Sequence, residues 1–301
     1  MTVLQCNQVS KIINGKAILK DFSFSIQAGE IVGLVGPNGA GKTTLMRLMT
    51  GLSRISAGSI HIKEMDINKQ FVSYIREIGA IIETPLFYPY LTGFQCLKYY
   101  SKLRSVHNDR LKEVVSLLGL TDAIHKKVKT YSLGMRQRLG IAQAILAEPA
   151  LLILDEPFNG LDPNGVAELR NILKKMAAGG TAVFLSSHTL NELEAICDRA
   201  ILMSEGRLIQ IKDIRIQEAG DFSNMSLSTS DDVKAMALIK THFTKVDVKR
   251  DQVIRLNQIH FDVFTDILLL LKTNGIKVIH MKEEKNTLEE TFMTLLGGGK
   301  R

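Results

Sequence analysis

One eight-residue run constrains this chain more than any other feature: Gly36-Pro-Asn-Gly-Ala-Gly-Lys42-Thr43. It fits the pattern GxxxxGK[ST] and lies between an apolar run, Ile31–Val35, and a helical stretch that continues from Thr44 to Met49. Glycines let backbone N–H groups converge on phosphate oxygens, and a helix start adds the positive end of its dipole. A chain of this length matches the pattern by accident about once in a hundred. The run therefore predicts a phosphate-binding loop in an α/β fold.

Individual residues of this loop have distinct predicted roles. Lys42 is expected to reach the β- and γ-phosphates of ATP, and the hydroxyl of Thr43 is expected to bind Mg²⁺. Thr44 adds a predicted contact on the α-phosphate side. The complete predicted phosphate-binding set is Gly36, Pro37, Asn38, Gly39, Ala40, Gly41, Lys42, Thr43 and Thr44.

Two further apolar runs end in polar residues suited to phosphate chemistry. Leu151–Leu154 is followed by Asp155 and Glu156, and Ala182–Leu185 is followed two serines later by His188. The carboxyl ends of parallel strands open onto the ligand crevice. We therefore expect Asp155 to hold Mg²⁺, Glu156 to polarise the attacking water and His188 to contact the γ-phosphate.

The chain is expected to contain two domains. Residues 1–218 alternate short apolar runs with helical stretches, which predicts a mostly parallel sheet, and a helical subdomain occupies about 86–147. Apolar residues at helical spacing run from Phe94 to Leu118 and from Arg136 to Ala147. Residues 219–301 form a small α+β accessory domain, with strands expected at 225–229, 246–256 and 277–281 and helices at 231–243, 261–273 and 287–296.

Composition and charge exclude several classes of protein. No apolar run approaches the ~18–20 residues that cross a bilayer, and the first residues lack a secretory-signal pattern. The three cysteines show no metal spacing, so we expect reduced, buried thiols. The net charge of +7 is concentrated in part between Lys98 and Lys129. A solvated helical face explains it, as does residence near an anionic membrane leaflet; no nucleic-acid-binding module is present.

The stretch between the phosphate loop and the acidic strand end identifies a family. Tyr131-Ser-Leu-Gly-Met-Arg-Gln-Arg138 resembles the LSGGQ-type signature of ABC transporter ATPases, and it stands shortly before Asp155. Asp162 lies in a stretch similar to the D-loop of that family, and His188 corresponds to its switch histidine. The resemblance covers residues 1 to about 215 in the family's order and implies a P-loop NTPase cassette that hydrolyses ATP.

The resemblance also implies partners. Two copies would pair head to tail, with ATP between the phosphate loop of one copy and the signature Ser132, Leu133, Gly134 and Met135 of the other. Such a pair drives an integral membrane permease on separate chains, which would hold this subunit peripherally at the cytoplasmic face of the cell membrane.

Three departures from the family pattern bear on function. Leu133 and Met135 replace a glycine and the glutamine of the signature. Ile13 stands where such cassettes carry an aromatic residue that stacks on adenine, so that contact is an apolar one. Glu83 stands where most cassettes have a glutamine, and the segment is similar to the "E-loop" of bacitracin-resistance and lantibiotic-immunity ATPases. A carboxylate would bind Mg²⁺ more strongly than an amide; a neutral replacement by a side chain of similar size is the alternative.

Four aromatic residues crowd the segment after Glu83: Phe87, Tyr88, Tyr90 and Phe94. Either they line a groove that receives a short helix of the permease, or they form the core of the helical subdomain. The function expected from these patterns is ATP-driven export of a bacitracin- or lantibiotic-type peptide for immunity or resistance. Export of another drug, lipid or ion, or a regulatory role without transport, are the alternatives.

Overall fold

The computed structural model describes residues 1–188, 190–214, 222–243, 246–250 and 253–284. The chain divides into two compact units, residues 1–214 and 215–301, which are described separately. The assignment of nucleotide binding to the first and an accessory role to the second stays a prediction.

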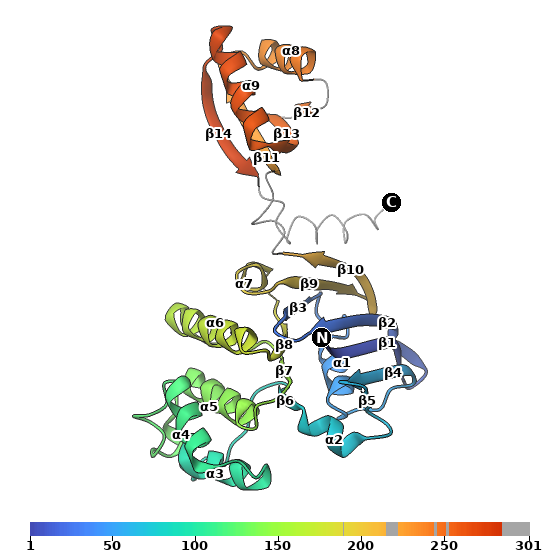
Figure 1. Ribbon diagram of the computed structural model, residues 1–301, viewed down its shortest axis with the longest axis vertical. Coiled ribbons are helices and arrows are strands. Elements are labelled where there is room, and N and C mark those ends of the chain that lie inside the picture. The colour runs from blue at the N-terminus through green and yellow to red at the C-terminus, as the bar shows by residue number, and fades with distance from the viewer. Residues whose placement is uncertain (189, 215–221, 244–245, 251–252, 285–301) are drawn as a thin grey trace. The chain divides into compact units, whose positions relative to one another are not determined.

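The first unit contains a six-stranded sheet in the order β10-β9-β3-β8-β7-β6 (Figure 1). Neighbouring strands from β9 to β6 are parallel, and only the edge pair β9–β10 is antiparallel. Every residue of β3, β7 and β8 is buried, as expected for strands that are covered on both faces. The predicted mostly parallel α/β sheet is confirmed. Its strands are β3 (Ile31–Val35), β6 (Ile78–Ile81), β7 (Leu151–Leu154), β8 (Ala182–Ser186), β9 (Arg199–Ser204) and β10 (Arg207–Asp213).

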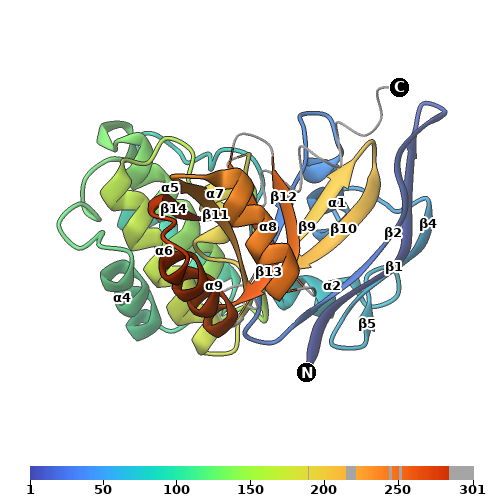
Figure 2. The same cartoon turned by 90° about the horizontal axis from the view of Figure 1, so that it is seen from above.

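A second, antiparallel sheet was not predicted. Two strands of twelve residues each, β1 (Thr2–Ile13) and β2 (Lys16–Gln27), run side by side (Figure 2). β1 also pairs with β4 (Ala57–Ile62), which in turn pairs with β5 (Met65–Asp66). Four irregularities interrupt the β1–β2 register, which weakens the strict alternation that would have revealed these strands. The sheet and helix α1 (Lys42–Met49) share one core with the parallel sheet, which anchors both sides of the phosphate loop.

Helices of the first unit lie on either side of the sheets, and α3, α4 and α5 pack together beside β6 (Figure 1). The expected helical span 94–118 is two helices, because Ser105 adopts a left-handed φ of 54° that ends the first one. The four predicted face residues Leu111, Val114, Val115 and Leu118 are all buried. The remaining helices are α2 (Phe71–Arg76), α3 (Gly93–Leu103), α4 (Asn108–Leu117), the 3₁₀ turn Val128–Thr130, α5 (Leu133–Ile145), α6 (Pro163–Ala178) and α7 (Leu190–Glu194).

The second unit has the order strand, helix, strand, strand, helix, strand. Its sheet runs β12-β13-β11-β14 with antiparallel neighbours, which is the split βαβ arrangement of ferredoxin-like folds. Residues of both helices, such as Ile239 and Ile267, share a core with Leu227 and Leu256 of the sheet. The elements are β11 (Phe222–Thr229), α8 (Asp232–His242), β12 (Asp247–Arg250), β13 (Ile254–His260), α9 (Phe261–Thr273) and β14 (Val278–Glu284).

One prediction in this unit is wrong. The single strand expected over 246–256 is a pair of antiparallel strands, β12 and β13, in which Arg250 lies opposite Ile254. The sequence between them contains neither glycine nor proline, so nothing local signals the reversal. The helix expected over 287–296 lies outside the described residues.

Within the described residues no helix is long and apolar enough to cross a membrane. Cys6, Cys96 and Cys197 are free and buried, as predicted. Burial raises the pKa of the Cys6 and Cys197 thiols well above the usual value, so both stay protonated and unreactive.

Candidate functional site

The predicted phosphate loop connects the end of β3 to the start of α1. Gly41 precedes the helix with a φ of 107°, a conformation that side-chain-bearing residues rarely adopt. The ammonium group of Lys42 donates a hydrogen bond of 2.6 Å to the carbonyl of Gly36 and is largely buried. The lysine therefore curls over its own loop, at the place where converging backbone N–H groups favour an anion.

A chain of hydrogen bonds joins this loop to the acidic end of β7. The hydroxyl of Thr43 donates to Asp155 Oδ2 at 3.0 Å, and the buried hydroxyl of Ser186 donates to Asp155 Oδ1 at 2.6 Å. The same Ser186 oxygen accepts the backbone N–H of Glu156 at 2.9 Å. Leu154 lies opposite Leu185 in the parallel register, so the residues that follow them meet at one sheet edge. Strand pairing thus fixes the position of both carboxylate residues.

The side chain of Glu156 is held from two directions. Its Oε2 atom accepts a hydrogen bond from Asn159 Nδ2 at 2.5 Å and lies 3.0 Å from His188 Nδ1. Glu156 has a left-handed φ of 49°, which persists only where surrounding contacts determine it. The structure therefore brings Glu156 and His188 together, and the roles expected of them stay predictions.

Glu83 also adopts a left-handed conformation, with a φ of 65°. It follows β6, and its carboxylate forms an ion pair with Arg47 of α1. Arg47 lies four residues after Thr43, one helical turn further along the same face. More than half of the Glu83 side chain is exposed, so this pair is the kind that contributes little stability and exchanges partners easily.

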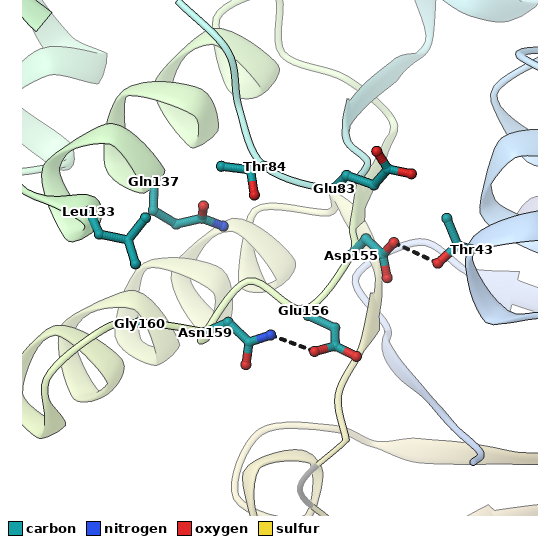
Figure 3. Close-up of a pocket in the computed structure, with 9 residues that line it drawn as sticks. All are labelled: Thr43, Glu83, Thr84, Leu133, Gln137, Asp155, Glu156, Asn159 and Gly160. Carbon is teal, nitrogen blue, oxygen red and sulfur yellow. Dashed lines mark hydrogen bonds between the residues drawn. The ribbon is translucent and has the colours of Figure 1, made fainter. Parts of the chain in front are cut away.

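A cavity of about 340 Å³ joins these groups to the signature helix. Figure 3 shows Leu133 and Gln137 of α5 at one end and Thr43 at the other, with the acidic residues between them. The lining residues are Thr43, Glu83, Thr84, Leu133, Gln137, Asp155, Glu156, Asn159 and Gly160. The cavity wall thus contains the three predicted metal ligands, Glu156 and one signature residue, Leu133, although they are far apart in the sequence. His188 and the other signature residues are not among the lining residues.

The signature residues lie at the start of α5. Ser132 is the residue that precedes the helix, and its hydroxyl accepts the backbone N–H of Met135 at 3.2 Å. Leu133 is 43% exposed. Free backbone N–H groups at a helix start, beside a serine hydroxyl, are suited to an anion.

Two further predicted residues, Asp162 and Ile13, also do not line this cavity. Asp162 precedes α6, and its carboxylate accepts the Gly165 N–H at 2.8 Å, so its described role is that of a helix cap. Ile13 ends β1 with a partly exposed side chain. The hydrogen bond of Asp162 therefore does not involve Asp155 or Glu156.

Several residues of the site had no predicted role. They are Arg47 and Ser186, which bond predicted carboxylates, and Thr84, Gln137, Asn159 and Gly160, which line the cavity. Ser186 carried a usable signal, because it follows an apolar strand at the same sheet edge as Asp155. Asn159 and Arg47 carried no usable signal. A position in a surface loop or on a helix face does not predict which carboxylate the side chain will contact.

The oxygen groups present fit a Mg²⁺ ion. Thr43 and Asp155 offer a hydroxyl and a carboxylate within hydrogen-bond distance of each other. Among the described residues no three His, Cys, Asp or Glu side chains gather as a metal cage. That is the expected pattern for Mg²⁺, which keeps waters and phosphate oxygens and takes only one or two protein ligands.

Comparison with known proteins decides the family. The family model described as ABC transporter matches residues 19–159. The chain is 43% identical to YhcH, an uncharacterized ABC transporter ATP-binding protein of Bacillus subtilis (strain 168), over 94% of this chain and 85% of that one. This chain belongs to the ABC transporter family.

Other relatives of this ABC protein carry more specific names. It is 34% identical to the bacitracin transport ATP-binding protein BcrA of Bacillus licheniformis, over 99% of this chain and 98% of BcrA. It is 36% identical to the lantibiotic transport ATP-binding protein SrtF of Streptococcus pyogenes, over 70% and 91%. A solved ATP-binding subunit of an ABC transporter superposes with a TM-score of 0.67 at 28% identity, over 72% of this chain and 92% of that one. The protein is therefore an ATP-binding subunit of an ABC transporter and an ABC-type ATPase.

Proposed function

We propose that this subunit powers the export of a peptide antibiotic of the bacitracin or lantibiotic type, through a permease on separate chains, and so confers immunity or resistance. The observation that carries the substrate class is Glu83. It lies in the wall of the catalytic cavity with its carboxylate paired to Arg47, in the position where most cassettes of this family have an amide. The names of two relatives, BcrA and SrtF, support the same class.

In the proposed reaction Glu156 polarises the water that attacks the γ-phosphate. Asn159 and His188 hold its carboxylate from two sides, which keeps it oriented before the substrate arrives. Lys42 would exchange its bond to Gly36 for phosphate oxygens, and Thr44 would contact the α-phosphate side. Thr43, Asp155 and Glu83 would hold Mg²⁺, which when bound would neutralise phosphate charge.

Two copies would complete each ATP site head to tail. The Ser132 hydroxyl and backbone N–H groups near Gly134 would make a second anion site at the start of α5. That site would close on the ATP held by the phosphate loop of the other copy. Asp162 would lie near the interface of the pair, and Ile13 would pack against the adenine ring without stacking on it.

The permease would contact the segment that follows Glu83. Tyr88 and Tyr90 are 75% and 74% exposed, and Leu86 is more exposed still. Phe94, in contrast, is half-buried against His125 at 5.3 Å between ring centres. The exposed tyrosines favour a docking surface for a helix of the permease, and Phe94 belongs to the helical core. Such docking would place the subunit at the cytoplasmic face of the membrane.

Growth inhibition of cells by a panel of cell-wall-targeting peptides, including bacitracin and several lantibiotics, tests this function. Cells with the native transporter are compared with cells that carry Glu156→Gln. Selective sensitivity of the variant to one peptide is the expected result. Unchanged sensitivity across the panel would refute the peptide class and leave export of another drug, a lipid or an ion as the function of this ABC ATPase.

A further inference from the structure

Two short segments of the first unit interlock, and one of the contacting residues, Leu133, is a position at which this chain departs from the family pattern. A Cβ atom on Gly160 would lie 2.1 Å from Leu133 Cδ2 and 3.1 Å from Leu133 Cγ. In the other direction, a Cβ atom on Gly134 would lie 3.1 Å from Leu161 Cδ2. Each leucine therefore rests on the glycine of the other segment.

The signature leucine thus touches the loop that holds the catalytic carboxylate. Gly160 directly follows Asn159, whose side chain donates the 2.5 Å hydrogen bond to Glu156. The loop is short and internally bonded, since Asn159 N–H donates to the Glu156 carbonyl and Leu161 N–H donates to the Phe158 carbonyl, each at 3.2 Å. A displacement of Gly160 is therefore transmitted to Asn159 within one residue.

The same elements are tied together a second time. Arg138, one and a half turns along α5 from Leu133, forms a 2.7 Å ion pair with Glu168 of α6. Since α6 begins at Pro163, directly after the loop, the loop is bounded on both sides by contacts to α5. Leu133, Asn159, Gly160 and Glu156 also line one cavity, along which Figure 3 shows them in sequence from α5 to the carboxylate.

We propose that Leu133 is a positioning residue for hydrolysis in its own subunit: through Gly160 it holds Asn159, and through Asn159 it orients the Glu156 carboxylate. This role is distinct from the contact that the signature makes with the ATP of the other copy. It rests on the proposed role of Glu156 as the group that polarises water. The Leu133 side chain occupies the space where a Cβ atom on residue 160 would lie, so the two residues are matched in size and a leucine at 133 requires a glycine at 160. A glycine at position 133 would leave that space empty.

The experiment is a double-mutant cycle on the purified full chain, with steady-state ATP hydrolysis and ATP affinity measured separately. Leu133→Ala is expected to lower kcat about threefold to tenfold and to leave the affinity for ATP unchanged, because one packing contact near the reacting group is lost. Asn159→Ala alone is expected to lower kcat about tenfold, because a hydrogen bond to a charged group is lost. In the Asn159→Ala background, Leu133→Ala should change kcat by less than about twofold, since the path to Glu156 is already broken.

A second pair of variants tests the size match. Gly160→Ala should lower kcat at least about tenfold, and adding Leu133→Ala should return most of that loss, because the added Cβ then has room. Gly275→Ala is the matched control for backbone strain. Gly275 has the same φ of 74° as Gly160 but no atom within 4 Å of the added Cβ, and it belongs to the other unit.

Equal losses from Leu133→Ala in the native and Asn159→Ala backgrounds would overturn the proposal, since Leu133 would then act on the other copy's ATP. Failure of Leu133→Ala to rescue Gly160→Ala would overturn the size match. Both results are distinguishable from failure of the proposed function: Glu156→Gln is measured in parallel, and undiminished hydrolysis in that variant would remove the assignment of Glu156 itself.

Discussion

At the phosphate-loop end of the site the polar side chains have partners within the chain: Lys42 bonds the Gly36 carbonyl, and Thr43 bonds Asp155, which Ser186 also bonds. At the signature end, Ser132 caps its own helix and Leu133 is 43% exposed. The first end is preorganised by strand register and loop closure. The second is the start of a helix, where backbone N–H groups favour an anion, and this agrees with the proposal that a second copy completes the site.

The largest effect is expected at the preorganised end. Glu156→Gln should lower kcat by about 10²- to 10⁴-fold, because the amide cannot accept the proton of the attacking water. ATP should still bind, since Lys42 and Thr43 are unchanged, and the ATP-bound protein should persist as a dimer in size-exclusion chromatography with light scattering. Hydrolysis at the native rate would show that another group activates the water.

A negative charge introduced at Ser132 should distinguish an effect on the folding of α5 from an effect on dimer formation. Ser132→Asp keeps an oxygen that caps α5, but it sets a negative charge against the γ-phosphate of the other copy. Hydrolysis and ATP-dependent dimer formation should fall by more than about a hundredfold, while ATP binding to the single copy is retained. Ser132→Asn is the matched control, because it has the same shape and caps the helix without the charge. An equal loss in both variants would mean that the cap, not the charge, decides activity.

A smaller effect is expected where the E-loop meets the phosphate loop. Glu83→Gln should raise the Mg²⁺ concentration for half-maximal hydrolysis about three- to tenfold, because one negative charge near the metal is lost. The effect is modest because solvent screens the charge of the exposed Glu83 side chain. Arg47→Gln frees the same carboxylate and should lower that concentration. Magnesium titrations of hydrolysis check both variants, and a shift in the same direction for the two would contradict Glu83 as a metal ligand.

The smallest effect is expected at the adenine. Ile13→Tyr should tighten ATP binding about fivefold, because a ring that stacks on the base replaces an aliphatic side chain. Fluorescence titration with ATP and GTP measures the gain and the change in base preference. No change in either affinity would place the adenine away from the end of β1.

Much of the fold and of the site followed from local patterns. The phosphate loop, Asp155 and Glu156 were predicted because each lies within a few residues of an apolar strand whose carboxyl end must face the crevice. His188 was predicted on the same reasoning, and the structure brings it to Glu156. The parallel strands were recognised from continuous apolar runs, whereas β1 and β2 were missed because their register is irregular.

The errors share a physical cause, which is contact between residues that are distant in the sequence. The strands β12 and β13 pair with each other, and both contribute residues to a core with Leu227 and Ile239, which are distant in the sequence. Ser186 reaches Asp155 across 31 residues, and Arg47 reaches Glu83 across 36. No spacing rule within one helix or strand reports such pairs.

The sequence by itself determined the family, the position of the predicted phosphate loop and the departures at Ile13, Leu133 and Glu83, because motifs record which chemical groups lie together on one short segment. Tertiary structure alone decided what those departures touch. Only folding brings Leu133 onto Gly160 and Glu83 to Arg47. The reason is that packing and ion pairing act between surfaces, and which surfaces meet depends on the register of strands and the closure of loops over the whole unit.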